Sequence, residues 1–161
     1  MKARARMGLA FAFGVIVFLG VLAFVRLAPS DPAEWHVDLA APGFDPAGGQ
    51  VFCITPDNRY GPLADGALAR LDAIVLATPR TERLAGSAEE GRITWITRSR
   101  LMGFPDYTTA QVMPGPGLCV FGRQRFGSKD LGVNAARIGG WMQALLGLAE
   151  APAMNGPFAQ P

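Results

Sequence analysis

The most apolar stretch of the chain lies near its amino terminus, where residues 7–25 are all apolar or glycine. At about 1.5 Å of rise per residue, a helix of this length just crosses a hydrocarbon core of about 30 Å. A cleaved signal peptide is the alternative, but its apolar core is usually shorter and ends in small residues. Cleavage after Ala28 would leave Arg26 and Leu27 before the cut, so residues 1–28 are predicted to hold an uncleaved transmembrane helix.

Basic residues flank this helix unequally, with Lys2, Arg4 and Arg6 before it and Arg26 after it. Cytoplasmic flanks carry an excess of Lys and Arg, so the amino terminus is predicted to be cytoplasmic. The chain is then anchored in the inner (plasma) membrane. Its main domain lies across that membrane, in the periplasm if the cell is Gram-negative.

Residues 29–49 are rich in proline and end near a glycine pair. This density of prolines disfavours a helix and predicts an extended spacer. Trp35 within it either anchors at the lipid interface or packs on the domain. His36, the only histidine of the chain, is expected at the surface.

Residues 50–148 show strand-like and helix-like patterns in the order strand, helix, four strands, helix. Short apolar or alternating runs predict strands at residues 50–55, 81–87, 91–101, 107–113 and 118–126. Apolar residues at three- and four-residue spacing predict helices over residues 64–77 and 131–148. The order predicts an α+β domain, an antiparallel sheet of about four to five strands with two helices on one face. Residues 149–161 are expected to be a flexible tail.

The net charge of the predicted domain bears on what kind of partner it can bind. The 161 residues carry 15 basic and 13 acidic side chains, a net charge of +2. Without the four basic residues that flank the first helix, 11 basic and 13 acidic residues remain, a net charge of −2. Because the predicted domain is not a polycation, no nucleic-acid partner is expected.

Arginines form the most distinctive pattern of the predicted sheet. Arg98 and Arg100 share one face of a predicted strand, and Arg123 and Arg125 share one face of another. If the two faces coincide, four guanidinium groups could bind a carboxylate, a phosphate or a lipid headgroup. The alternative is a solvated face whose arginines pair with Asp106, Asp130 and Glu82.

Cys53 and Cys119 are the only cysteines, and both lie in predicted strands. Outside the cytoplasm they can form a disulfide if the strands are adjacent, and otherwise they are two buried thiols. A single histidine without a cluster of cysteines or carboxylates predicts no metal site. No cofactor and no catalytic residue are predicted.

Two segments of the chain resemble a bacterial and chloroplast family known as domain of unknown function 1499. They are TRSRLMGFPDYTT at residues 97–109 and RQRFGSKDLGVNAARI at residues 123–138. The resemblance covers roughly residues 51–148 and implies a domain type without an established activity. The matching positions are Arg98, Ser99, Arg100, Phe104, Asp106, Arg123, Arg125, Asp130, Gly132, Asn134 and Arg137.

The same positions also fit a structural network that would lock the sheet to the last helix. Asp130 precedes that helix, where it can cap the first turn and accept from a strand arginine. Asn134 in the first turn can hydrogen-bond the backbone of a neighbouring loop. Asp106 can pair with Arg98 or Arg100.

The sequence therefore favours a single-pass membrane protein without catalytic activity. Its domain is expected to act as a binding or accessory module for an envelope complex, a lipid or a small anionic ligand. The alternative is an envelope enzyme, a hydrolase or a lipid-modifying protein, with an Arg/Asp site. The scarcity of histidines and of metal-ligand clusters favours the binding module.

Overall fold

The computed structural model describes residues 2–55, 60, 63–115, 117–127 and 131–148. The five strands form one sheet in the order β1-β5-β4-β3-β2, and every neighbouring pair is antiparallel. This arrangement confirms the α+β prediction. The elements are α1 (Lys2–Leu27), α2 (Pro32–Trp35), β1 (Gly49–Ile54), α3 (Ala67–Leu76), β2 (Thr81–Ser87), β3 (Arg92–Arg98), β4 (Pro105–Met113), β5 (Gly117–Gln124) and α4 (Val133–Leu146).

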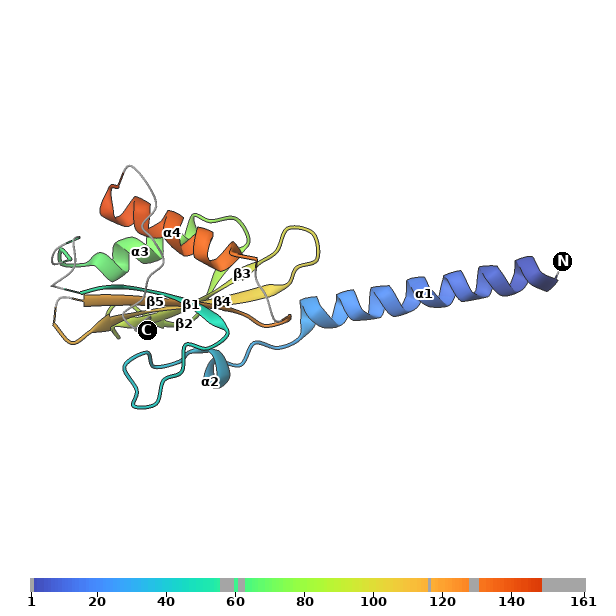
Figure 1. Ribbon diagram of the computed structural model, residues 1–161, viewed down its shortest axis with the longest axis horizontal. Coiled ribbons are helices and arrows are strands. Elements are labelled where there is room, and N and C mark those ends of the chain that lie inside the picture. The colour runs from blue at the N-terminus through green and yellow to red at the C-terminus, as the bar shows by residue number, and fades with distance from the viewer. Residues whose placement is uncertain (1, 56–59, 61–62, 116, 128–130, 149–161) are drawn as a thin grey trace.

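Helix α1 extends away from the domain as a long rod (Figure 1). Its segment Arg6–Leu27 is 22 residues long, and its length and composition are sufficient to cross a membrane. Both a membrane anchor and a signal sequence have this character.

One face of the sheet packs against α3 and α4, as predicted (Figure 1). Side chains alternate along a strand, so Ile93 and Trp95 of β3 both point to this side. They join a single apolar core that the two helices close, made of Phe52, Ile54, Leu68, Leu71, Val75, Ile93, Trp95, Ala110, Leu118, Val120, Ile138, Trp141 and Met142.

Helix α4 lies close to β5 because Gly122 carries no side chain. A Cβ atom at Gly122 would lie 2.8 Å from Cδ1 of Ile138 and 3.5 Å from the side chain of Asn134. A larger residue would require the end of the Ile138 side chain to shift, so glycine at this position allows the close approach of the helix.

A charged contact also joins α4 to the sheet, with a different arginine from the one expected. Arg137 Nη2 donates to Asp106 Oδ2 at 3.0 Å, and Arg137 Nη1 donates to Asn134 Oδ1 at 2.8 Å. The register aligns Asp106 with Thr97, so Asp106 lies on the helix side of the sheet while Arg98 lies on the other side. The expected pairing of Asp106 with Arg98 or Arg100 is therefore wrong.

Residues 28–48, which we call the strap, cover the second face of the sheet. Trp35 is 6% exposed and stacks on Tyr107 of β4 with ring centroids 3.8 Å apart. Phe44 meets Phe121 of β5 edge to face at 5.2 Å. The segment predicted as an extended spacer is thus a packed layer, and its short helix α2 lies opposite α3 and α4 (Figure 1).

Cys53 and Cys119 face each other in the register of β1 and β5 and form a disulfide. Both cysteines are buried beside Leu39 of the strap and Phe121. The bond therefore ties the edge strand β1 to the sheet beneath the strap.

Replacing both cysteines by alanine should destabilise the domain. The bond joins residues 66 positions apart, and closing a loop of this length is worth about 4 kcal/mol in the chain-entropy model. We expect the urea midpoint of the C53A/C119A variant to fall, as followed by circular dichroism. A reductant should lower the midpoint of the wild type but leave that of the variant unchanged.

Replacing Trp35 by alanine should loosen the strap. Truncating a buried tryptophan typically costs about 3–5 kcal/mol. Chemical denaturation of the full chain in detergent should show this loss, whereas Val112→Ala, at a half-exposed position of β4, should change stability little. Equal stabilities of Trp35→Ala and the wild type would show that the strap is not part of the folded domain.

Candidate functional site: an arginine-lined cleft

The arginines on the strap side of the sheet and at the end of α1 fall into two groups. The strand register places Arg98, Arg123 and Arg125 on the strap side of the sheet, so the two arginine faces coincide. However, β4 separates them, and the two sets of side chains have different surroundings. One group holds the strap, and the other lines a cleft beside the end of α1.

Arg123 and Arg125 of the first group hold the strap by its backbone. Arg123 Nη2 donates to the carbonyl of Glu34 at 2.9 Å, and its guanidinium lies 4.5 Å from the ring centre of Trp35. Arg125 Nη1 donates to the carbonyl of Pro29 at 2.8 Å. Burial lowers the pKa of Arg123, and the charge of Glu34 opposes that shift. Both arginines are thus committed to structure.

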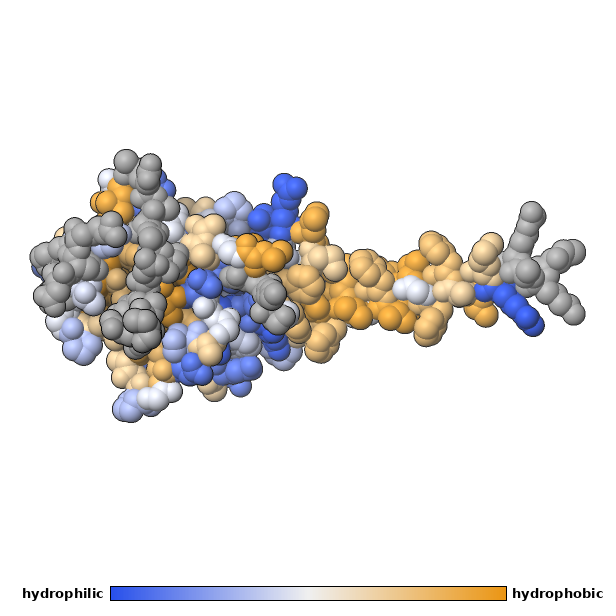
Figure 2. All heavy atoms as spheres, viewed as in Figure 1, coloured by the Kyte–Doolittle hydropathy of each residue, from blue (hydrophilic) through white to orange (hydrophobic). Residues whose placement is uncertain are grey.

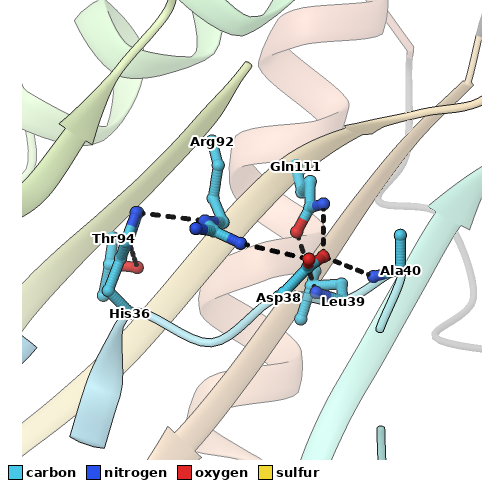
Figure 3. Close-up of polar contacts among 7 residues, drawn as sticks. All are labelled: His36, Asp38, Leu39, Ala40, Arg92, Thr94 and Gln111. Atoms are coloured by element: carbon cyan, nitrogen blue, oxygen red, sulfur yellow. Dashed lines mark hydrogen bonds and ion pairs between the residues drawn. The ribbon is translucent and has the colours of Figure 1, made fainter. Parts of the chain in front are cut away.

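Arg92 completes the first group through His36 of the strap (Figure 3). Arg92 Nε donates to His36 Nε2 at 3.0 Å, and His36 Nδ1 lies 2.8 Å from Thr94 Oγ1. Arg92 Nη1 is 3.6 Å from Asp38 Oδ2, and Asp38 Oδ1 accepts from Gln111 Nε2 at 2.7 Å. His36, expected at the surface, is therefore partly buried and uses both ring nitrogens.

The second group lines an open cleft of about 490 Å³ where α1 meets the domain. Arg26 belongs to the last turn of α1, Arg80 precedes β2, Arg98 ends β3 and Arg100 lies in the following turn. Four arginines thus face one acidic residue, Glu82. The other lining residues are Thr81, Ser99 and Gly103.

Arg26 fastens α1 to the turn between β3 and β4. Its Nη2 donates to the carbonyl of Leu101 at 2.9 Å, and its Nε donates to that of Met102 at 3.3 Å. Gly103 has a φ of +74°, and a Cβ atom there would lie 2.9 Å from Cγ of Arg26. Glycine is therefore required both for the turn and for the approach of this arginine.

The other three arginines are poorly neutralised. Arg80 has a left-handed φ of 61°, and its Nε donates to the carbonyl of Arg98 at 3.1 Å. Arg98 Nη2 is 3.8 Å from Glu82, while Arg98 Nη1 is buried without a hydrogen-bond partner. Arg100 is exposed, and within the described part of the chain it makes no hydrogen bond or ion pair.

This arrangement suits the binding of an anion. A guanidinium group presents five donors in a planar fork that matches the oxygens of phosphate or carboxylate. Cations gathered in one cleft repel each other, and a bound anion would relieve that repulsion. No group of three or more His, Cys, Asp or Glu side chains that could hold a metal ion occurs in the described ranges.

A family model described as "Protein of unknown function (DUF1499)" matches residues 44–145. The chain belongs to this family. The DUF1499 region contains all five strands, α3, nearly all of α4 and every cleft residue except Arg26. Helix α1 and the strap as far as residue 43 precede it. No curated protein and no solved structure matches the chain.

The structure separates the residues that the DUF1499 motifs single out. Arg98 and Arg100 lie in the cleft, Arg123 and Arg125 hold the strap, and Asp106, Asn134 and Arg137 form the contact with α4. Asp130, predicted to cap the last helix, lies outside the described residues, and Gly132 is the N-cap of α4.

Two of the four cleft arginines were not predicted as site residues, Arg26 and Arg80. The sequence did contain a signal for Arg80. Residues 81–87 and 91–101 were predicted as neighbouring antiparallel strands, and pairing these strands places residue 80 beside residue 98. Arg26 depends on where α1 ends relative to the sheet, which no local pattern of the sequence encodes.

The contacts of His36 make the stability of the folded protein depend on pH. Burial lowers the pKa of His36, the charge of Arg92 lowers it further, and Glu90 acts in the opposite direction. Hydrogen bonds from Gln111 and from the backbone of Ala40 lower the pKa of Asp38, so it stays ionised near neutral pH. The unfolded chain therefore takes up the His36 proton at a higher pH than the folded chain.

This contribution to stability should be complete above about pH 6.5 and should be lost as the pH falls through the lowered pKa of His36. Thermal midpoints measured between pH 7.5 and pH 5 should fall more for the wild type than for His36→Gln, which cannot titrate. If the thermal midpoints of the two proteins fell equally with pH, His36 would not be the group responsible for the pH dependence.

Proposed function

We propose that this protein is a membrane-anchored binding module whose arginine-lined cleft takes an anionic group outside the cytoplasm. The observation that carries the proposal is the set of four arginines that share one cleft with a single acidic residue. Among the described residues Arg100 makes no hydrogen bond or ion pair, and Arg98 has one loose ion pair, with Glu82 at 3.8 Å.

The contacts at the end of α1 support a retained anchor. Val25 is 5% exposed, and Arg26 bonds the turn between β3 and β4. Removal of α1 as a signal peptide would remove these contacts from the mature domain. The helix therefore serves the folded protein better as a permanent anchor.

Two observations support a domain outside the cytoplasm. Lys2, Arg4 and Arg6 precede the apolar segment, which fits a cytoplasmic amino terminus. The Cys53–Cys119 disulfide fits an oxidising compartment. The proposed location is the inner membrane, with the domain in the periplasm of a Gram-negative cell.

The alternative of an Arg/Asp enzyme is less well supported. Asp106 and Arg137 form an Asp–Arg pair, but their side chains are only 16% and 14% exposed. The pair connects β4 to α4 and lies apart from the lining of the cleft. Its position favours a structural role.

Removal of two cleft charges should weaken anion binding. In nanodiscs of zwitterionic lipid, we expect the full-length wild type to bind pyrophosphate, as measured by calorimetry. The R98Q/R100Q variant should bind at least about tenfold more weakly, because it lacks two charge-assisted sets of donors.

Arg70→Gln is the matched control, since Arg70 is exposed on α3 away from the cleft and, among the described residues, donates to the carbonyl of Asp65 alone. The control should bind like the wild type. Binding that is unaffected by the double substitution, or absent from the wild type, would refute the proposed function.

A further inference from the structure

We propose that the anion taken by the cleft is the phosphate of an anionic phospholipid, and that the domain docks on the leaflet from which α1 emerges. This inference rests on the proposed function and identifies the class of its ligand. The docking surface is the end of the domain nearest α1, formed by residues 99–104 and by residues 125–127 and 131, and we call it the base.

The geometry of α1 places the cleft at the level of the lipid headgroups. The 22 residues of Arg6–Leu27 span about 33 Å at about 1.5 Å each, close to the thickness of a hydrocarbon core. Arg26 therefore lies at the membrane surface. Because Arg26 bonds Leu101 and Met102 directly, the turn that borders the cleft lies at the same level.

The base carries apolar side chains that the rest of the described domain leaves uncovered. Leu101 is 77% exposed at the tip of the turn between β3 and β4, and Leu131 is 91% exposed just before α4. Both segments lie on the side of the domain where α1 joins it (Figure 1). Exposed leucines at this place gain free energy when they enter the acyl boundary of a membrane.

An aromatic row makes the apolar surface of α1 continuous with the base. Phe24 of α1 lies 6.3 Å from Phe126, which lies 6.0 Å from Phe104. Figure 2 shows α1 as an apolar rod that ends against hydrophilic atoms of the domain. An apolar rim beside a cluster of arginines is the pattern of a surface that inserts shallowly into an anionic membrane.

The position of the cleft at the level of the headgroups and the apolar rim of the base together favour a lipid over a soluble anion. A phospholipid beside α1 presents its phosphate at the height of Arg26, within the leaflet that would receive Leu101. A lipid also brings its negative charge to the cleft without diffusion through the solvent. The apolar rim would have no role in the binding of a free phosphate.

The first test measures lipid selectivity on the full chain. Detergent-solubilised protein is incubated with equal amounts of dioleoylphosphatidylglycerol and dioleoylphosphatidylcholine, and retained lipid is counted by native mass spectrometry. We expect several-fold more phosphatidylglycerol than phosphatidylcholine on the wild type and on Arg70→Gln. R98Q/R100Q should lose that preference, because one arginine near an anionic membrane surface is worth roughly a factor of five.

Arg100→Glu provides a second variant that does not endanger folding, because Arg100 is exposed and makes no hydrogen bond or ion pair with the described residues. It should reverse part of the preference for the anionic lipid. If the wild type binds pyrophosphate but does not prefer phosphatidylglycerol, the lipid assignment is wrong and the proposed function stands. If it binds neither, both are wrong.

The second test measures docking. Leu101→Trp in nanodiscs that contain brominated phosphatidylcholine should lose fluorescence beyond the level of the wild type. Val112→Trp, near the opposite end of β4, is the matched control and should not be quenched. Equal quenching at the two positions, or none at position 101, would overturn the docked orientation.

Discussion

The stacking of Trp35 on Tyr107 anchors the strap to the sheet, and the positions of α1 and of the cleft depend on that attachment. The central strands bury side chains on both faces, so the sheet needs two covers. Helices α3 and α4 form one cover, and the strap forms the other. Because the strap begins where α1 ends, its attachment fixes the end of α1, and with it Arg26, beside the sheet.

The way in which the strap is held follows from its composition. A segment without regular structure has carbonyl groups that lack partners, and Arg123 and Arg125 donate to two of them. Prolines have no N–H group, so a proline-rich segment has fewer donors to satisfy against an apolar sheet. The prolines that predicted an extended spacer therefore also make the segment suitable as a cover.

Periodicity was sufficient to predict the elements of the domain. The strand predicted at residues 81–87 has those bounds in the structure, and the two helices differ from prediction by a few residues at their ends. The strap was not predicted because Trp35, Leu39 and Phe44 follow no regular spacing. Its signal lay elsewhere, in the unbroken apolar run of β5, which is typical of strands buried on both faces.

The candidate site was predictable only in part. Strand alternation left open whether Arg98 and Arg123 lie on one side of the sheet, which the register shows that they do, and it could not show that the strap would occupy Arg123. The alternation of side chains along a strand does explain why Asp106 does not pair with Arg98 as predicted. Positions that face each other across an antiparallel pair point to the same side, and Asp106 faces Thr97.

The attachment of the strap also limits where the domain can act. As a free extended chain, residues 28–48 would give the domain a radius of roughly 70 Å about its anchor, at about 3.3 Å per residue. Folded onto the sheet, the same residues leave almost no slack. With α1 as the anchor, the domain would search for its partners by lateral diffusion in two dimensions, and a molecule deep in the solvent would have to come to it.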